Sequence, residues 1–272
     1  MLILSLFSCS PPQKNAPPAA TAQNEIRAAD DDVFVAQLAA VMRNAQLPAA
    51  LSANIQTAAA QSPAFINDLR ACLAGDRSLR ALVDKQHPLP TGYAPSDLVT
   101  LTDGAYRVNR AGLQLRKAAA ESLAEMAAEA RKEGITLLAS STYRSYDYQV
   151  EVYNRNVREM GQEAADRESA RPGHSQHQTG LVVDFGSIDD SFALTAAGRW
   201  MAANASRFGW SLSFPDGYEA VTGYRWESWH YRYVGRELAA FIDAYFGGIQ
   251  QYALRFLHEW ELYTMKNGNI DL

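Results

Sequence analysis

The spacing of three predicted strands constrains this fold more than any other feature of the sequence. The segments ITLLAS (135–140), LVVDF (181–185) and WHYRYV (229–234) have the apolar or alternating pattern that is typical of strands. Long stretches separate these segments, and each stretch contains a helical pattern. Because helices come first and the strands then pair across long insertions, the sequence favours an α+β fold with a small, mostly antiparallel sheet flanked by helices.

Helical patterns occupy both ends of the chain. Residues 31–81 repeat apolar positions at helical spacing, and Pro48 and Pro63 divide them, so we predict an extra N-terminal helical region of three or more short helices. Residues 241–272 are predicted to form a C-terminal helical extension that Gly247-Gly248 interrupt. Between the two ends, helices are predicted over residues 110–133, 145–161 and 195–208.

The composition is that of a soluble globular chain of one or two domains. The 272 residues are 47% apolar and 20% charged, which excludes a collagen-like, fully disordered or multi-span membrane protein. The formal net charge of −5 argues against a nucleic-acid-binding protein, which would show a basic excess. Two cysteines, Cys9 and Cys72, do not make a disulfide framework. Cys72 lies in a predicted helix, where we expect it to be a small buried apolar residue.

Residues 1–9 have the pattern of a bacterial lipoprotein signal. A short apolar run ends in Ser8-Cys9, and a Pro- and Ala-rich stretch follows, so we predict that residues 1–30 are a signal and a disordered linker. Cys9 would carry the lipid, and the protein would be exported to the cell envelope or periplasm with this anchor as its membrane contact. Because the run is short and lacks basic residues, the alternative is a disordered tail with a chance cysteine.

Two histidines and one carboxylate form a candidate metal-binding set. His177 and Asp184 lie seven residues apart, and His230 lies at the third predicted strand. Two imidazoles and one carboxylate suit a Zn²⁺ ion with its fourth position open, which is the arrangement of a catalytic zinc site. The same ligand types also suit Fe²⁺ in an oxygenase, although such enzymes usually place a His and an Asp two residues apart.

Glu227 and Arg144 would complete a hydrolytic site. Glu227 lies three residues before His230, and a carboxylate in that position would accept a proton from an attacking water and pass it to the leaving amine. Arg144 would stabilise a developing oxyanion or hold an anionic end of the substrate, because a guanidinium binds a carboxylate through two hydrogen bonds.

Three motifs in order make the chain resemble the VanY type of bacterial zinc D-alanyl-D-alanine and L,D-carboxypeptidases. The motifs are YRSYxxQ (143–149), PGHSQHxxGxxxD (172–184) and TGYxxExWHxRYVG (222–235). The resemblance extends over residues 82–240, which we therefore predict to be a zinc carboxypeptidase domain. It implies a small antiparallel sheet with helices packed around it.

The resemblance also implies roles for individual residues. The three candidate ligands would bind one Zn²⁺ ion, and Glu227 would be the general base and acid. Arg144 and Gln149 would face the substrate and hold its terminal carboxylate or scissile carbonyl, and Ser175 would line the same pocket. The substrates would be stem peptides of peptidoglycan, from which the enzyme would remove the terminal D-alanine at an L,D or D,D bond.

Several residues depart from the pattern of the family. Gln176 stands where a glutamate is frequent, and Ser213, Phe214 and Tyr218 stand where an arginine, a tyrosine and a lysine are common. These changes leave the ligands and Glu227 in place but put the substrate preference in question. Two alternatives stay open: an endopeptidase on the same scaffold, and a non-catalytic, zinc-containing protein that binds the cell wall.

Overall fold

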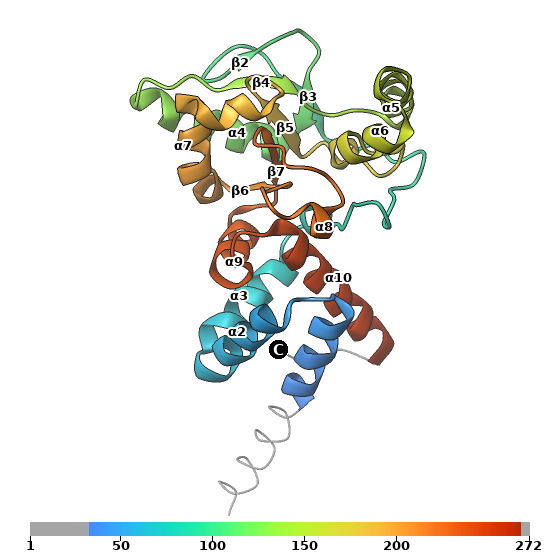
Figure 1. Ribbon diagram of the computed structural model, residues 1–272. Helices are drawn as coiled ribbons and strands as arrows, with labels where there is room; N and C mark the ends of the chain where they lie inside the picture. The colour runs from blue at the N-terminus through green and yellow to red at the C-terminus, as the bar shows by residue number, and fades with distance from the viewer. Residues whose placement is uncertain (1–32, 268–272) are drawn as a thin grey trace, which may run out of the picture.

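The computed structural model describes residues 33–267, and two hydrophobic cores divide them into two units (Figure 1). The sheet unit runs from residue 98 to residue 233 and contains all the strands of the described residues. The helical unit joins residues 33–74 to residues 236–267. The predicted α+β class, with helical regions at both ends, is confirmed.

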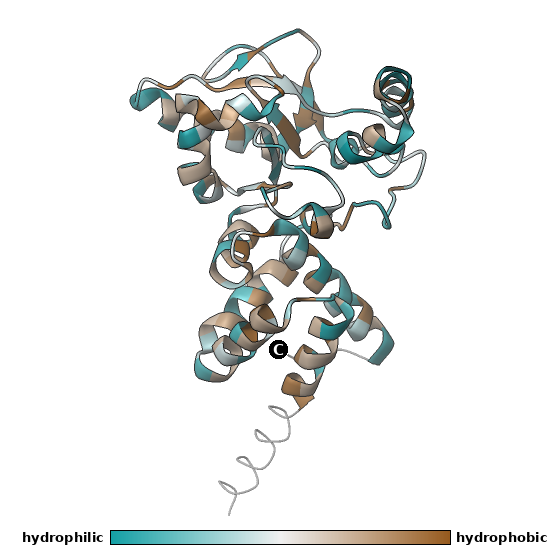
Figure 2. Cartoon of the chain, in the orientation of Figure 1, coloured by the Kyte–Doolittle hydropathy of each residue, from teal (hydrophilic) through white to brown (hydrophobic). Residues whose placement is uncertain are grey.

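A five-stranded sheet in the order β2-β4-β5-β7-β6 forms the centre of the sheet unit. Only the pair β2 and β4 is parallel, so the prediction of a mostly antiparallel sheet is confirmed. Figure 2 shows hydrophobic residues along these central strands and hydrophilic residues on the outer helices. The strands are β2 (Arg107–Val108), β4 (Leu138–Ser141), β5 (Val182–Phe185), β6 (Trp210–Leu212) and β7 (His230–Tyr233).

Helices and short 3₁₀ turns surround this sheet. The elements are α4 (Lys117–Lys132), α5 (Tyr146–Met160), α6 (Gln162–Glu168), η2 (Gln176–Thr179), η3 (Asp190–Leu194), α7 (Ala196–Asn204), η4 (Ala205–Phe208) and α8 (Glu219–Thr222). The longest of these helices, α4, buries its apolar face, and its residues Leu123 and Met126 are inaccessible to solvent. Ser145 caps α5, the next helix, because its side chain accepts a hydrogen bond from the backbone nitrogen of Tyr148. The predicted start of this helix at Ser145 is thus confirmed.

One predicted helix begins later than the sequence indicates. The helix expected over residues 110–133 begins at Lys117, because residues 114–116 form strand β3 (Gln114–Arg116). β3 pairs antiparallel with β1 (Leu98–Thr100) in a separate two-stranded ladder. Strands of two or three residues are too short to show an alternating pattern, so the sequence does not predict β1, β2, β3 or β6.

The helical unit is formed by both ends of the described chain. Its elements are residues 33–44, α2 (Ala49–Gln61), α3 (Pro63–Ala74), α9 (Arg236–Phe246) and α10 (Gln250–Asn267), and the short turn η1 (Arg77–Arg80) follows α3 in the connecting segment. Pro48 and Pro63 begin α2 and α3, and Gly247 and Gly248 separate α9 from α10, as predicted. Phe65 of α3 is fully buried, and its ring lies 5.7 Å from that of Phe241 in α9 and 6.5 Å from that of Phe256 in α10. The two helical regions therefore share one core.

A buried carboxylate in the segment between α3 and β1 holds that segment to the helical unit. Asp84 accepts hydrogen bonds from the backbone nitrogens of Gln86 and His87, from the His87 ring at 2.7 Å and from Nε2 of Gln251 in α10 at 2.7 Å. Burial alone would raise the pKa of Asp84, but these hydrogen bonds outweigh it and lower the pKa below its ordinary value. The carboxylate therefore favours the folded state at neutral pH.

The structure tests the prediction for one of the two cysteines. Cys72 is buried in α3, and burial raises its pKa to about 12, which confirms a packing role and keeps the thiol protonated. Cys9 lies outside the described residues, so its lipidation stays a prediction. Among residues 33–267, no helix combines the length and hydrophobicity that a membrane span needs.

The shared core predicts that a single aromatic ring supports both ends of the chain. We expect Phe65→Ala to lower the free energy of unfolding by about 4 kcal/mol, because it removes a fully buried ring and leaves a cavity. Urea denaturation followed by circular dichroism measures this change. The control is Val35→Ala, at a site 54% exposed in the same unit, which should change stability little. Equal effects of the two substitutions would contradict the shared core.

The environment of Asp84 predicts a pH-dependent stability. We expect Asp84→Asn to lower the free energy of unfolding by about 2 kcal/mol at pH 7, because charged hydrogen bonds are lost. A depressed pKa stabilises the fold above the unfolded value of about 4 and loses that effect as pH falls through the folded value. The difference between wild type and variant should therefore shrink below about pH 4. Asp216→Asn, at an exposed residue, is the control and should change stability little. A difference for Asp84→Asn that stays constant with pH would disprove the assignment.

Candidate metal centre

Strands β5 and β7 bring together two of the three candidate ligands. In this antiparallel pair Asp184 lies directly opposite His230, and their exposed fractions are 4% and 5%. On the other side of β5, β4 pairs Ser141 with Asp184 across a register shift between Ala139 and Ser141. A bulge of this kind redirects side chains at a strand end. The ladder therefore directs the carboxylate and one imidazole to the same place.

His177 comes from η2, the turn that precedes β5. Its Nδ1 lies 2.7 Å from the carbonyl oxygen of Thr142, which accepts the imidazole proton and leaves Nε2 facing Asp184. Gly180 ends the turn at a φ of 70°, and a Cβ there would lie 3.0 Å from side-chain atoms of Leu98 and Arg116. Glycine is therefore needed for η2 to pack closely.

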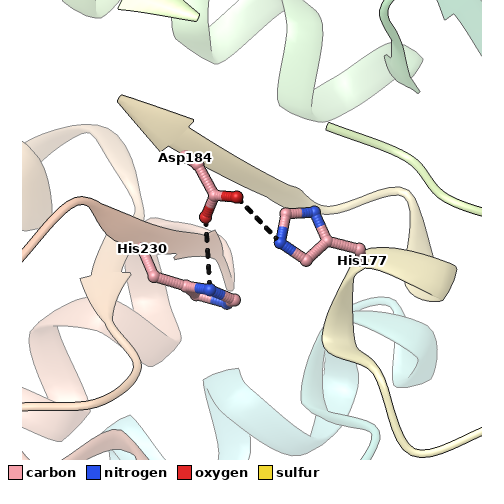
Figure 3. Close-up of side chains that lie close together, drawn as sticks. All are labelled: His177, Asp184 and His230. Atoms are coloured by element: carbon pink, nitrogen blue, oxygen red, sulfur yellow. Dashed lines mark ion pairs between the residues drawn. The ribbon is translucent and has the colours of Figure 1, made fainter. Parts of the chain in front are cut away.

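The three predicted ligands converge on one point (Figure 3). Nε2 of His177 lies 3.2 Å from Oδ2 of Asp184, and Nδ1 of His230 lies 3.3 Å from Oδ1 of the same carboxylate. One ligand atom from each residue lies within 4.8 Å of the others. Nε2 of His177 and Oδ1 of Asp184 are buried without a hydrogen-bond partner among the described residues. Because unpaired buried polar atoms are costly, the arrangement fits a bound metal ion.

Burial and neighbouring charges shift the pKa values of these ligands in different directions. Burial, reinforced by Arg144, lowers the pKa of His177 to about 4, so this imidazole is neutral, as a metal ligand must be. Burial acts in the same way on His230, but the carboxylates of Asp184 and Glu227 outweigh it and raise its pKa to about 9. Burial would raise the pKa of Asp184, yet the two histidines hold it well below its ordinary value. The site thus carries carboxylate charge that a cation can balance.

Glu227 lies beside the ligands in the loop that enters β7. Its Oε2 is 3.0 Å from Nδ1 of His230, and its backbone nitrogen donates to the carbonyl oxygen of Phe214. The side chain faces the same cleft as the ligands but is 8% exposed. Burial raises the pKa of Glu227 above its ordinary value, and the positive charge of His230 opposes this only in part. A carboxyl group with a raised pKa is suited to accept and donate protons.

Arg144 and Gln149 form a pair next to the metal ligands. Nη1 of Arg144 donates to Oε1 of Gln149 at 2.9 Å, and Nη2 lies 4.0 Å from Oδ2 of Asp184. Nε2 of Gln149 donates to the carbonyl oxygen of Ala170, and this side chain is 1% exposed. Gln149 is therefore not among the residues that line the cleft, and its contact with the cleft is through Arg144.

Ser175, the last of the predicted site residues, and the residues that depart from the family pattern lie around η2. Ser175 lines the cleft, and its Oγ accepts a hydrogen bond from the backbone nitrogen of His177. Two of the departures contact each other, since Oγ of Ser213 donates to Oε1 of Gln176 at 2.7 Å. The ring of Phe214 lies 4.6 Å from that of His230 and also lines the cleft.

The cleft above the ligands has a volume of about 450 Å³ and includes residues that the sequence analysis did not assign. Tyr148, Val152 and Arg155 line it from α5, and their spacing of four and three residues is the signal that could have identified this helix face. Tyr224 lines it from the third motif and packs 4.9 Å from Phe214. Thr142 was also missed, because its role depends on a backbone carbonyl that any residue carries.

Comparisons with known proteins identify the sheet unit. The family model VanY, described as D-alanyl-D-alanine carboxypeptidase, matches residues 112–236. A protein of Bacillus subtilis named as a carboxypeptidase, YodJ, is 36% identical over 191 residues, which are 66% of this chain and 70% of that protein.

Two solved structures extend the likeness to the fold. The LD-carboxypeptidase LdcB, described for its recognition of peptidoglycan, is 37% identical with a TM-score of 0.57, over 63% of this chain and 86% of the other. A mutant of the vancomycin-resistance D,D-pentapeptidase VanY in complex with Zn(II) is 30% identical with a TM-score of 0.56, over 65% and 99% of the two chains. On the strength of the family match, these similarities and the metal centre, the chain belongs to the VanY family of D-alanyl-D-alanine carboxypeptidases, which are hydrolases.

Proposed function

We propose that this protein is a zinc-dependent carboxypeptidase that removes the terminal D-alanine from peptidoglycan stem peptides. The observation that carries the proposal is the position of Glu227, a buried carboxyl group 3.0 Å from the candidate ligand His230 and facing the same cleft. A site that only bound a metal would have no need of that second, unligated carboxylate. The substrates of LdcB and VanY, named for L,D and D,D cleavage, support the choice of peptide.

The residues that would hold zinc are His177, Asp184 and His230. When bound there, a Zn²⁺ ion supplies Lewis-acid chemistry, since it polarises a carbonyl group and lowers the pKa of water to about 7. The Zn(II) complex of the VanY mutant and the adjacent carboxylate favour zinc over the Fe²⁺ alternative.

Glu227 would transfer the proton in both halves of the reaction. Its carboxylate takes a proton from the attacking water and then delivers it to the nitrogen of the leaving D-alanine. Burial favours the protonated form that the second half requires, and the neighbouring His230 favours the ionised form that the first half requires. One carboxyl group therefore has surroundings that suit both roles.

Arg144 would bind the substrate. Within the described residues its guanidinium makes one hydrogen bond, to Gln149, so other N–H groups are available for a substrate oxygen. A terminal carboxylate held in this way places the last peptide bond near the ligands, which distinguishes a carboxypeptidase from the endopeptidase alternative. Export and lipidation at Cys9 belong to the same proposal, because a wall-trimming enzyme acts outside the cytoplasm.

The proposal predicts a defined mass change in a peptide substrate. Zinc-loaded protein is incubated with muropeptides carrying a tetrapeptide or a pentapeptide, and mass spectrometry records the products. We expect loss of one alanine from at least one substrate, at the L,D bond of the tetrapeptide or the D,D bond of the pentapeptide. Glu227→Ala should retain zinc and reduce the rate by at least about 100-fold, because it removes the general base.

The outcomes separate the alternatives. Cleavage of cross-linked dimers without loss of a terminal alanine would establish the endopeptidase instead. Bound zinc without hydrolysis of any of these substrates would establish the non-catalytic protein.

The contacts of Arg144 predict how it recognises the substrate. We expect Arg144→Lys to lower kcat/KM by about 100-fold, because an ammonium group does not reproduce the fork of N–H donors that a guanidinium offers. Arg158→Lys, on the exposed side of α5, is the matched control and should retain activity.

A peptide with a C-terminal carboxamide identifies the group that Arg144 binds. If Arg144 holds the terminal carboxylate, the wild type should prefer the acid and the lysine variant should lose that preference. An equal loss for both peptides would assign Arg144 to the scissile carbonyl. Unchanged kinetics would remove Arg144 from the site.

A further inference from the structure

A buried set of hydrogen bonds joins the metal centre to the helical unit. Oγ of Ser213 donates to Oε1 of Gln176 at 2.7 Å and lies 3.5 Å from Oε1 of Gln250, the first residue of α10. Nε2 of Gln250 donates to the carbonyl oxygen of Ser211 at 3.2 Å. The exposed fractions of Gln176, Ser213 and Gln250 are 4%, 2% and 1%. Buried amides that are paired in this way hold a defined geometry, because breaking a bond leaves a polar group unpaired.

Ser213 lies between the two segments that carry the histidine ligands. Its hydroxyl holds the side chain of Gln176, the residue before His177, and its backbone nitrogen donates to the carbonyl oxygen of His230 at 3.1 Å. A displacement of Ser213 therefore moves both segments. Residues that hold metal ligands in place affect metal affinity without contacting the metal.

Gln250 holds Ser211, two residues before Ser213, from outside the sheet unit. It lies beyond residues 112–236, the part of the chain that the family model matches, and on a helix whose apolar face is buried in the core of the helical unit. Its side chain reaches away from that core to the end of β6, where its Nε2 donates to the carbonyl oxygen of Ser211. Its Oε1 lies 3.5 Å from Oγ of Ser213, whose one proton goes to Gln176. The next residue, Gln251, instead bonds to Asp84.

We infer that Gln250 is a positioning residue of the metal centre. Through its hydrogen bond to Ser211 it fixes the end of β6, and with it the position of Ser213, which contacts both ligand-bearing segments. The helical unit is thereby part of the support of the site. The inference rests on the proposed function, since the ligands it concerns are those proposed for zinc.

Zinc affinity tests the inference without relying on activity. We expect Gln250→Met, which keeps the length of the side chain but removes both polar groups, to weaken zinc binding about 10-fold in competition with a chromophoric chelator. In zinc-saturated enzyme the kcat for D-alanine release should fall while KM is retained. Ser213→Ala should also weaken zinc binding, because it removes the hydrogen bond that holds Gln176, the residue before His177.

Gln251→Met is the matched control. It removes an equally buried glutamine one residue away, so it should lower the stability to urea to a similar extent while zinc affinity and kcat are retained. Equal zinc affinities of the wild type and Gln250→Met would overturn the inference, as would equal losses of affinity in the two methionine variants.

Two further results keep the test decisive. If Gln250→Met does not fold, Ser213→Ala removes only one hydroxyl group, and unchanged zinc affinity in that variant would overturn the inference. If the wild type binds zinc and releases D-alanine but Gln250→Met does so equally well, only this inference fails. If the wild type binds no zinc, the proposed function fails with it.

Discussion

The antiparallel register of β5 and β7 is the constraint on which the site depends. It places Asp184 opposite His230, so that two ligands on strands separated by more than forty residues of chain meet without any loop having to hold them. A shift of one residue would direct one of the two side chains to the opposite face of the sheet. The register is held by the buried apolar residues on both strands, such as Val183 and Tyr231, which face each other in the next pair. The hydrophobic core therefore determines where these two candidate ligands meet.

Charge balance is the second condition of the site. Asp184 and Glu227 are both buried, and the chain places two cationic groups near them, His230 in contact with both and Arg144 at 4.0 Å from Asp184. Two carboxylates in one buried site repel each other, which contributes to the raised pKa of Glu227. A divalent cation at the ligands would relieve this repulsion, and Glu227 would then ionise more readily than it does in the protein alone. The same ion would thus bind the candidate ligands and adjust the carboxyl group that we propose as the base.

The sequence predicted the parts of the site whose residue types carry the chemistry. Two histidines, two carboxylates and an arginine are rare enough in combination that the spacing of three motifs was sufficient to select them, and long helices such as α5 were predicted by their caps. What the sequence did not show depends on backbone atoms or on contacts between distant segments. The backbone carbonyl of Thr142 has no signal in the sequence, and strands of two or three residues show no alternating pattern. Gln149 was expected to line the cleft, but it lies behind Arg144, to which it is hydrogen-bonded. The sequence likewise did not predict that the two helical regions share a core, because the pattern of an amphipathic helix does not show which helix it packs against.

The connectivity explains why a helical unit assembled from the two ends of the chain has consequences for the centre. β7 carries His230 and passes into α9 through Val234, which is already buried in the core of the helical unit. From the other direction, Nη2 of Arg232 in β7 donates to the carbonyl oxygens of Leu79 and Ala81, at the point where the N-terminal helices end. Strand β7, which carries the candidate ligand His230, is thus bonded to the segment after the N-terminal helices and continues into the C-terminal helices. Its neighbour β6 is hydrogen-bonded to α10. The core of the helical unit combines residues from both sides of the ligand-bearing segments in the sequence, and it therefore supports a site whose candidate ligands all lie between them.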